Sequence, residues 1–73
     1  MGKLRVMSGK EVCSILKQHG FIEIRRKGSH IAMQKKDSAG TVTIPVPDHV
    51  EIRPGTLQAI IRQSGIPRSE FES

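Results

Sequence analysis

One histidine of this sequence follows a run of cations and a Gly-Ser corner, which is a combination that suits acid-base chemistry. Residues 25–30 read Arg-Arg-Lys-Gly-Ser-His, so His30 comes directly after the corner. Histidine is the side chain best able to take and give a proton near neutral pH. From the residues alone three interpretations of His30 stay open: an ordinary strand residue, a metal ligand, or a proton-transfer group.

The other side chains that could share such chemistry are Cys13, His19 and His49. They contain no pair at the close spacings typical of zinc sites, and no spacing rule ties them to His30, so a metal site is disfavoured. Cys13 is the only cysteine and cannot close an internal disulfide; we expect a small, buried, apolar residue. For His49 we expect a structural role, such as a hydrogen bond that fixes its loop.

The charge of the chain favours a phosphate polymer or an acidic protein as partner. Twelve Lys and Arg against seven Asp and Glu give the 73 residues a net charge of +5. The chain has no Trp or Tyr, which argues against a protein that binds single-stranded nucleic acid by stacking its bases on aromatic side chains. No segment approaches the roughly 20 apolar residues of a membrane span, and the start of the chain does not resemble a signal peptide. We therefore expect a cytoplasmic protein that contacts nucleic-acid backbone.

A helix is predicted over residues 9–19. Ser8 and Glu11 have the spacing of a capping box, which supplies partners to the exposed amides at a helix start. Apolar residues then recur at helical spacing, and Gly20 provides the left-handed residue that commonly ends a helix.

A second helix is predicted over residues 57–64, with Gly55 or Thr56 as its cap. The tail that follows has room for one more helical turn, from which Ile66 and Phe71 would return to the core.

Three strands are predicted between the helices. Residues 21–36 alternate between apolar and polar side chains and are interrupted at 28–29, which predicts a hairpin of two strands. A third strand is predicted over residues 41–44, and we expect Pro45 and Pro47 to end it because proline lacks a donor for the ladder.

These elements predict one domain over residues 1–73, of the α+β class. Its expected form is an α-β-β-β-α chain in which a three-stranded antiparallel meander carries both helices on one face. The side chains expected to meet the helices are Ile22, Ile24, Ile31, Met33, Val42 and Ile44. Those expected on the open side are Glu23, Arg25, His30, Ala32, Gln34, Thr41 and Thr43.

Four segments together resemble the HicA (YcfA-like) toxins of type II toxin-antitoxin pairs. They are "GKEVCSILKQHGF", "RRKGSH", "VPDH" and "RPGTLQAIIRQSGI", in the order and spacing of that family over residues 8–71. The resemblance implies a double-stranded-RNA-binding-like fold, metal-independent cleavage of messenger RNA and inhibition by a HicB antitoxin. It also places the catalytic histidine of the family on His30. Members of the family often carry an aromatic residue shortly after that histidine, where this chain has Ile-Ala-Met-Gln.

The chemistry expected of His30 is proton transfer during attack of a ribose 2′-hydroxyl on its own phosphate, with no metal and no small-molecule cofactor. Nearby cations would favour the neutral ring, which can accept a proton. A HicB-like antitoxin is expected to cover His30, and the alternative function is a non-catalytic RNA-binding module of the same fold. The expected RNA-binding residues are Arg25, Arg26, Lys27, Gly28, Ser29, Lys35 and Lys36.

Overall fold

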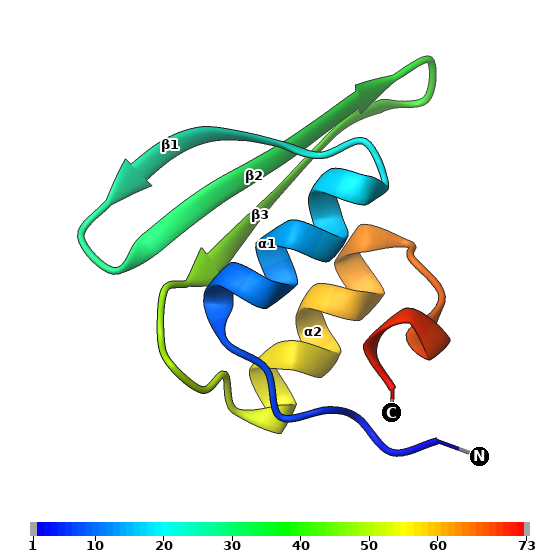
Figure 1. Cartoon of the computed structure of the whole chain (residues 1–73). Coiled ribbons are helices and arrows are strands. Elements are labelled where there is room, and N and C mark those ends of the chain that lie inside the picture. Colours follow the sequence, from blue (N-terminus) through cyan, green and yellow to red (C-terminus); the bar gives the residue numbers. More distant parts are fainter. Residues whose placement is uncertain (1, 73) are drawn as a thin grey trace.

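The computed structural model describes residues 2–72 (Figure 1). The three strands form one antiparallel sheet in the order β1-β2-β3, which confirms the predicted α-β-β-β-α chain and its α+β class. The elements are α1 (Gly9–Gln18), β1 (Ile22–Lys27), β2 (His30–Asp37), β3 (Gly40–Pro47), α2 (Pro54–Ser64) and the short 3-10 helix η1 (Arg68–Phe71).

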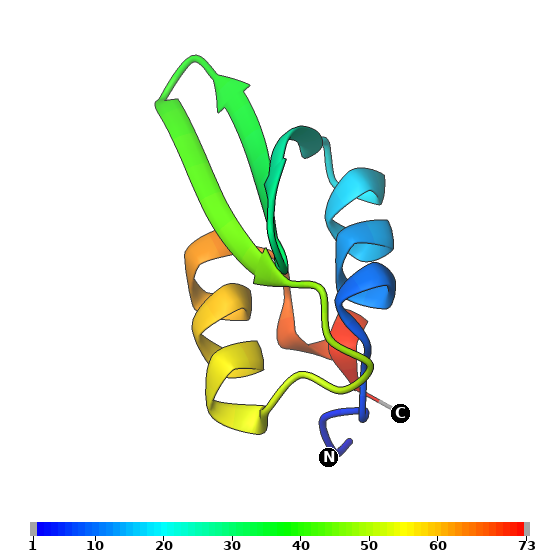
Figure 2. The same ribbon diagram turned by 90° about the vertical axis from the view of Figure 1, so that its left-hand side faces the viewer.

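Both helices pack on the same face of the sheet, and the other face is open (Figures 1 and 2). The sheet contributes the inward side chains of β2 and β3, and each helix contributes one apolar stripe, because a single stripe must be buried against the sheet to keep each helix folded. The buried residues that form this core are Met7, Val12, Cys13, Leu16, Phe21, Ile31, Met33, Ile44, Val46, Ile52, Leu57, Ile60, Ile66 and Phe71.

The predicted sides of Ile22, Glu23 and Ile24 in β1 are wrong, whereas Arg25 lies on the open side as predicted. Ile22 and Ile24 are 62% and 45% exposed, whereas Phe21 is only 2% exposed. Glu23 lies opposite the buried Met33 and therefore shares the face covered by the helices. The alternation of the strand is set by the aromatic ring of Phe21, which buries more apolar surface than either isoleucine. A bulge at Ile24 then changes the register by one residue.

The third strand is longer than predicted and contains the prolines that we expected to end it. Pro45 pairs with Ala32, and the ladder runs on to Pro47. This is possible because β3 is an edge strand, where a missing amide donor can face solvent. The β2–β3 hairpin also extends beyond the helices (Figure 1), which leaves Val42 40% exposed instead of buried as expected.

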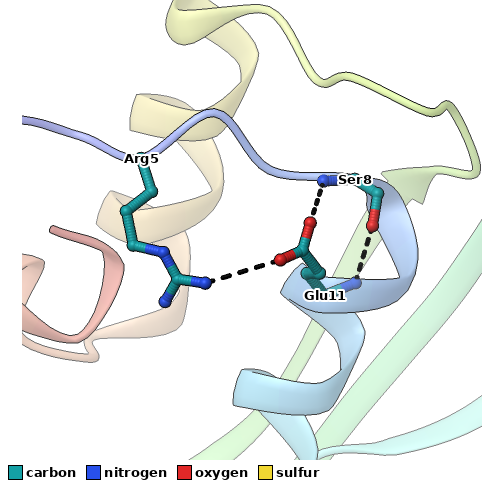
Figure 3. A network of polar contacts seen from close by, with 3 residues as sticks. All are labelled: Arg5, Ser8 and Glu11. Carbon is teal, nitrogen blue, oxygen red and sulfur yellow. Dashed lines mark hydrogen bonds and ion pairs between the residues drawn. The ribbon is translucent and has the colours of Figure 1, made fainter. Parts of the chain in front are cut away.

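Both helix starts reflect their local sequence. In α1 the Ser8 hydroxyl accepts from the Glu11 amide at 3.1 Å, and the Glu11 carboxylate accepts from the Ser8 amide at 3.0 Å (Figure 3). The predicted capping box is thus confirmed. Helix α2 begins at Pro54, earlier than predicted, and its cap is Arg53 rather than Gly55 or Thr56, because the fixed φ of proline suits the first helical position.

The two ends of the described chain lie together (Figure 1). Leu4 forms a bridge with Glu72, and the Arg5 amide donates to the Phe71 carbonyl at 2.9 Å. Phe71 is fully buried and Ile66 is 6% exposed, so the predicted return of the tail to the core is confirmed.

Candidate functional site

The site is built on the turn between β1 and β2. Gly28 and Ser29 form a two-residue loop, and Gly28 has a φ of 59°. A glycine with positive φ in the first loop position is typical of the type II′ turn, whose twist matches that of the flanking strands. A Cβ at Gly28 would meet no atom within 4 Å, so the backbone conformation, and not crowding, calls for glycine here.

His30 is the first residue of β2 and lies on the open face of the sheet. The next residue, Ile31, is 1% exposed and points into the core, so the alternation of the strand turns the exposed His30 outward. Its direct neighbours in the sheet are Lys27 on β1 and Pro47 on β3. Opposite residues have Cβ atoms about 5 Å apart, so the imidazole and the Lys27 ammonium can reach the same phosphate group.

Two of the other predicted RNA-binding residues share the face of His30. Arg25 pairs with Ala32 and lies diagonally from His30, within reach of a long side chain. Lys36 pairs with Thr41 and also points outward, but it lies six residues along β2, a distance of roughly 20 Å at the usual rise per residue. Arg25 and Lys27 are therefore the cations that accompany His30.

The bulge in β1 turns Arg26 to the opposite face, towards α1. Its guanidinium forms an ion pair of 2.6 Å with Asp48 and lies 3.9 Å from Glu23. The hydrogen bond to Asp48 raises the pKa of Arg26 above its ordinary value. Lys35 also faces inward, and its Nζ lies 5.9 Å from the centre of the Phe21 ring. The structure thus separates Arg26 and Lys35 from the face that carries His30.

Asp48, which was not among the predicted site residues, holds the turn in place by two hydrogen bonds. Its amide donates to the Ser29 carbonyl at 2.6 Å, one residue before His30, while its carboxylate binds Arg26. Gly9 packs against the same loop, and its amide donates to the His49 carbonyl at 2.9 Å. The loop-fixing bond expected of His49 therefore comes from its backbone. The sequence feature that could have identified Asp48 is an acidic residue directly after a strand in a chain rich in cations.

A comparison with protein families matches this chain to the family described as HicA toxin of bacterial toxin-antitoxin, over residues 9–66. That match covers most of the 73 residues and includes the turn, His30 and Asp48. The chain belongs to the HicA toxin family. No curated protein matched the sequence.

The remaining titratable candidates of this HicA-family toxin have structural contacts. His19 caps the end of α1, and its Nε2 lies 3.4 Å from a carboxylate oxygen of Glu70 on η1. Cys13 is 5% exposed, and burial raises the pKa of its thiol, so the nucleophilic thiolate is disfavoured.

No group of three or more His, Cys, Asp or Glu within residues 2–72 is arranged to hold a metal ion. Over the same residues, neither helix has the length and apolar character needed to cross a bilayer.

The arrangement around His30 provides the parts needed for acid-base chemistry on a phosphodiester. An exposed imidazole can transfer a proton, and the side chains of Lys27 and Arg25 can bind the charged oxygens. Gly28 has no side chain to keep a ligand away from the turn. The HicA-family toxin thus presents its candidate site on the exposed face of the sheet.

Proposed function

We propose that this HicA-family toxin is a metal-independent endoribonuclease that cleaves messenger RNA in the cytoplasm, with His30 as its proton-transfer residue. The observation that carries the proposal is the position of His30: it is exposed, begins β2, and lies directly opposite Lys27 beside a tight turn. A phosphate bound by that cation would bring the neighbouring ribose to the imidazole.

In the proposed reaction, neutral His30 accepts the proton of a ribose 2′-hydroxyl as that oxygen attacks the adjacent phosphorus. The bond from phosphorus to the 5′ oxygen breaks, and water supplies the proton that this oxygen needs to leave. Lys27 and Arg25 stabilise the negative charge on the non-bridging oxygens. The products are a 2′,3′-cyclic phosphate and a 5′-hydroxyl. A single acid-base residue contributes about 10²- to 10⁴-fold, so we expect a slow enzyme.

The family supports an antitoxin partner, and we propose a HicB-type protein that neutralises the toxin by covering His30. The same exposed cations that would bind phosphate, Arg25 and Lys27, would bind acidic side chains of such a protein. RNA cleavage should therefore stop when the purified toxin is saturated with its antitoxin. Full activity in the saturated complex would contradict direct covering.

The second candidate function is RNA binding without cleavage. It is favoured by the exposed cations on the open face and by the absence of a side-chain partner that orients His30 within residues 2–72. In this case the basic hairpin would hold the RNA backbone, and His30 would be one more contact.

One experiment separates the two functions. End-labelled RNA is incubated with the toxin at low salt, with and without excess chelator, and the ends of any fragments are determined. We expect fragments with 2′,3′-cyclic phosphate ends at the same rate in both samples. Intact RNA with a salt-sensitive gel shift would support the binding module, and loss of cleavage with chelator would indicate a metal-dependent reaction.

A further inference from the structure

A hollow of about 250 Å³ lies on the helix side of the sheet, between α1 and β1. Two lysines of α1, Lys10 and Lys17, line it together with Ser14. Arg26 and the carboxylate of Glu23 line it from β1, so its lining carries three cations and one anion. The three α1 residues are spaced i, i+4 and i+7, which places them on one face of the helix. Side chains that can donate to an anion thus converge on one small space from two elements.

The charges around this hollow are not balanced. Arg26 is paired with Asp48 and Glu23, but neither Lys10 nor Lys17 forms an ion pair within residues 2–72. Two ammonium groups beside one hollow favour an anion there, since like charges that share a site stabilise a bound counter-charge.

The size of the hollow limits the ligand. Cavities for small molecules and cofactors usually measure about 300–1,000 Å³, whereas a water molecule occupies about 30 Å³. The hollow is therefore large enough for one phosphate group with a few waters and too small to enclose a nucleoside cofactor. Cys13 also lines the hollow, but burial raises its pKa, which disfavours a reactive thiolate.

We propose that this hollow binds a backbone phosphate of RNA, with Lys10, Ser14 and Lys17 as the ligands beside Arg26. This inference rests on the proposed action on RNA and adds a second contact, on the side of the sheet opposite His30. A phosphodiester is favoured over an acidic peptide because two ammonium groups, a hydroxyl and a guanidinium surround one small space and can share the oxygens of a single phosphate. The Glu23 carboxylate that also lines the hollow already has Arg26 as its partner, at 3.9 Å.

The two contacts lie close enough for one RNA strand to reach both. Arg26 pairs with Ile31, and the next pair along the ladder is Lys27 with His30, a step of about 3.4 Å along the strand. Because β1 is an edge strand, no further strand separates the hollow from the open face. RNA that passes around this edge can place one phosphate at His30 and another at Lys10 and Lys17.

The test uses the full chain with His30→Ala, which prevents cleavage in the proposed mechanism, and measures binding of a short fluorescent single-stranded RNA across a salt series. Lys10→Gln/Lys17→Gln is compared with Lys3→Gln/Arg62→Gln. The two pairs remove the same charge of two units, but Lys3 and Arg62 do not line the hollow. Circular dichroism verifies that both proteins are folded.

For Lys10→Gln/Lys17→Gln we expect a loss of affinity of about tenfold and a slope of log affinity against log salt that is smaller by about 0.7, which is one phosphate contact on single-stranded RNA. The control pair should keep the slope of the parent. Equal losses for the two pairs would overturn the hollow as a site, and leave the proposed ribonuclease intact. If the variant bound RNA as the parent does but bound the antitoxin more weakly, the hollow would be a contact for the protein partner, and the proposed phosphate site would be wrong. A parent with no salt-sensitive RNA binding would overturn both.

Discussion

Asp48 joins the turn before His30 to the strand beside it through two bonds of 2.6 Å. In Asp48→Asn the hydrogen bond from the backbone amide of residue 48 to the Ser29 carbonyl is kept, but Arg26 loses its ionic partner. We expect RNA cleavage to slow by up to about 10²-fold, since small displacements of a reacting group are costly. The free energy of unfolding should change by less than about 1 kcal/mol, because exposed ion pairs contribute little. Single-turnover cleavage and urea denaturation measure the two quantities.

Glu72→Gln is the matched control, because Arg68 and Glu72 form an ion pair of 2.7 Å on the exposed surface of the C-terminal segment. It should leave the cleavage rate unchanged. If the two variants cleaved equally fast, Asp48 would be a surface ion-pair residue with no role in positioning the turn.

At the residue scale the alternation of β2 predicts the outward side of His30, and the structure agrees. Arg25 also lies on the open side, as predicted. The sides of Ile22, Glu23 and Ile24 could not be predicted in the same way, because Phe21 sets the alternation of β1 and the bulge at Ile24 reverses it before Arg25. A bulge has no reliable sequence signal here, since the strand already contains a plausible apolar pattern. The role of Asp48 could not be predicted for a related reason: it depends on hydrogen bonds to Ser29 and Arg26, which lie far away in the sequence.

The capping box of α1 gives the stability of this helix a pH dependence. The Ser8 amide and then the Ser8 side chain hold the pKa of Glu11 below its ordinary value, with a smaller contribution from the charge of Arg5 at 3.4 Å (Figure 3). A lowered carboxyl pKa stabilises the folded state above the ordinary glutamate pKa of about 4.3, and this contribution is lost as the pH falls through the lower folded value.

We therefore expect Glu11→Gln to be less stable than the wild type at neutral pH and to lose less stability on acidification. Thermal unfolding followed between neutral pH and pH 3 measures this difference. Parallel pH profiles for the two proteins would contradict it.

The contact between α1 and the loop after β3 requires a glycine. A Cβ at Gly9 would overlap the Pro47 carbonyl oxygen and lie 2.9 Å from the Asp48 Cα. Gly9→Ala should thus lower the free energy of unfolding by about 1–3 kcal/mol, although alanine favours helix more than glycine does. Because the loop carries Asp48, cleavage should slow as well.

Gly55→Ala in the first turn of α2 is the control, since a Cβ there would meet nothing within 4 Å. It should stabilise the protein by up to about 1 kcal/mol. Urea denaturation gives both values, and a stabilised Gly9→Ala would show that the close contact with the loop is absent.

The helices and strands could be predicted from local signals, but the end of β3 could not. The capping box and Gly20 predict α1 well because they are chemical features of a few neighbouring residues. The prolines of β3 are compatible with a strand only at a sheet edge, and the edge is a property of the whole sheet. Tertiary structure therefore decided the length of β3.

At the scale of the whole molecule, the tail closes the core and joins the two ends of the described chain. Phe71 is fully buried, and its carbonyl accepts from the Arg5 amide. Phe71→Ala should cost about 3–5 kcal/mol, out of the 5–15 kcal/mol typical of a domain. Val50→Ala is the control, because Val50 is 93% exposed and its loss should change stability by less than about 0.5 kcal/mol. Equal urea midpoints for the two variants would show that the tail does not belong to the core.

The sheet has two unlike faces: one is covered by the helices, and the other is open and carries His30 at the start of the central strand. The most direct test of His30 is single-turnover cleavage of one RNA, in excess chelator, by the wild type, His30→Ala and the control His49→Ala. We predict a rate about 10²- to 10⁴-fold lower for His30→Ala and an unchanged rate for His49→Ala. Equal rates for the wild type and His30→Ala would contradict proton transfer at this residue.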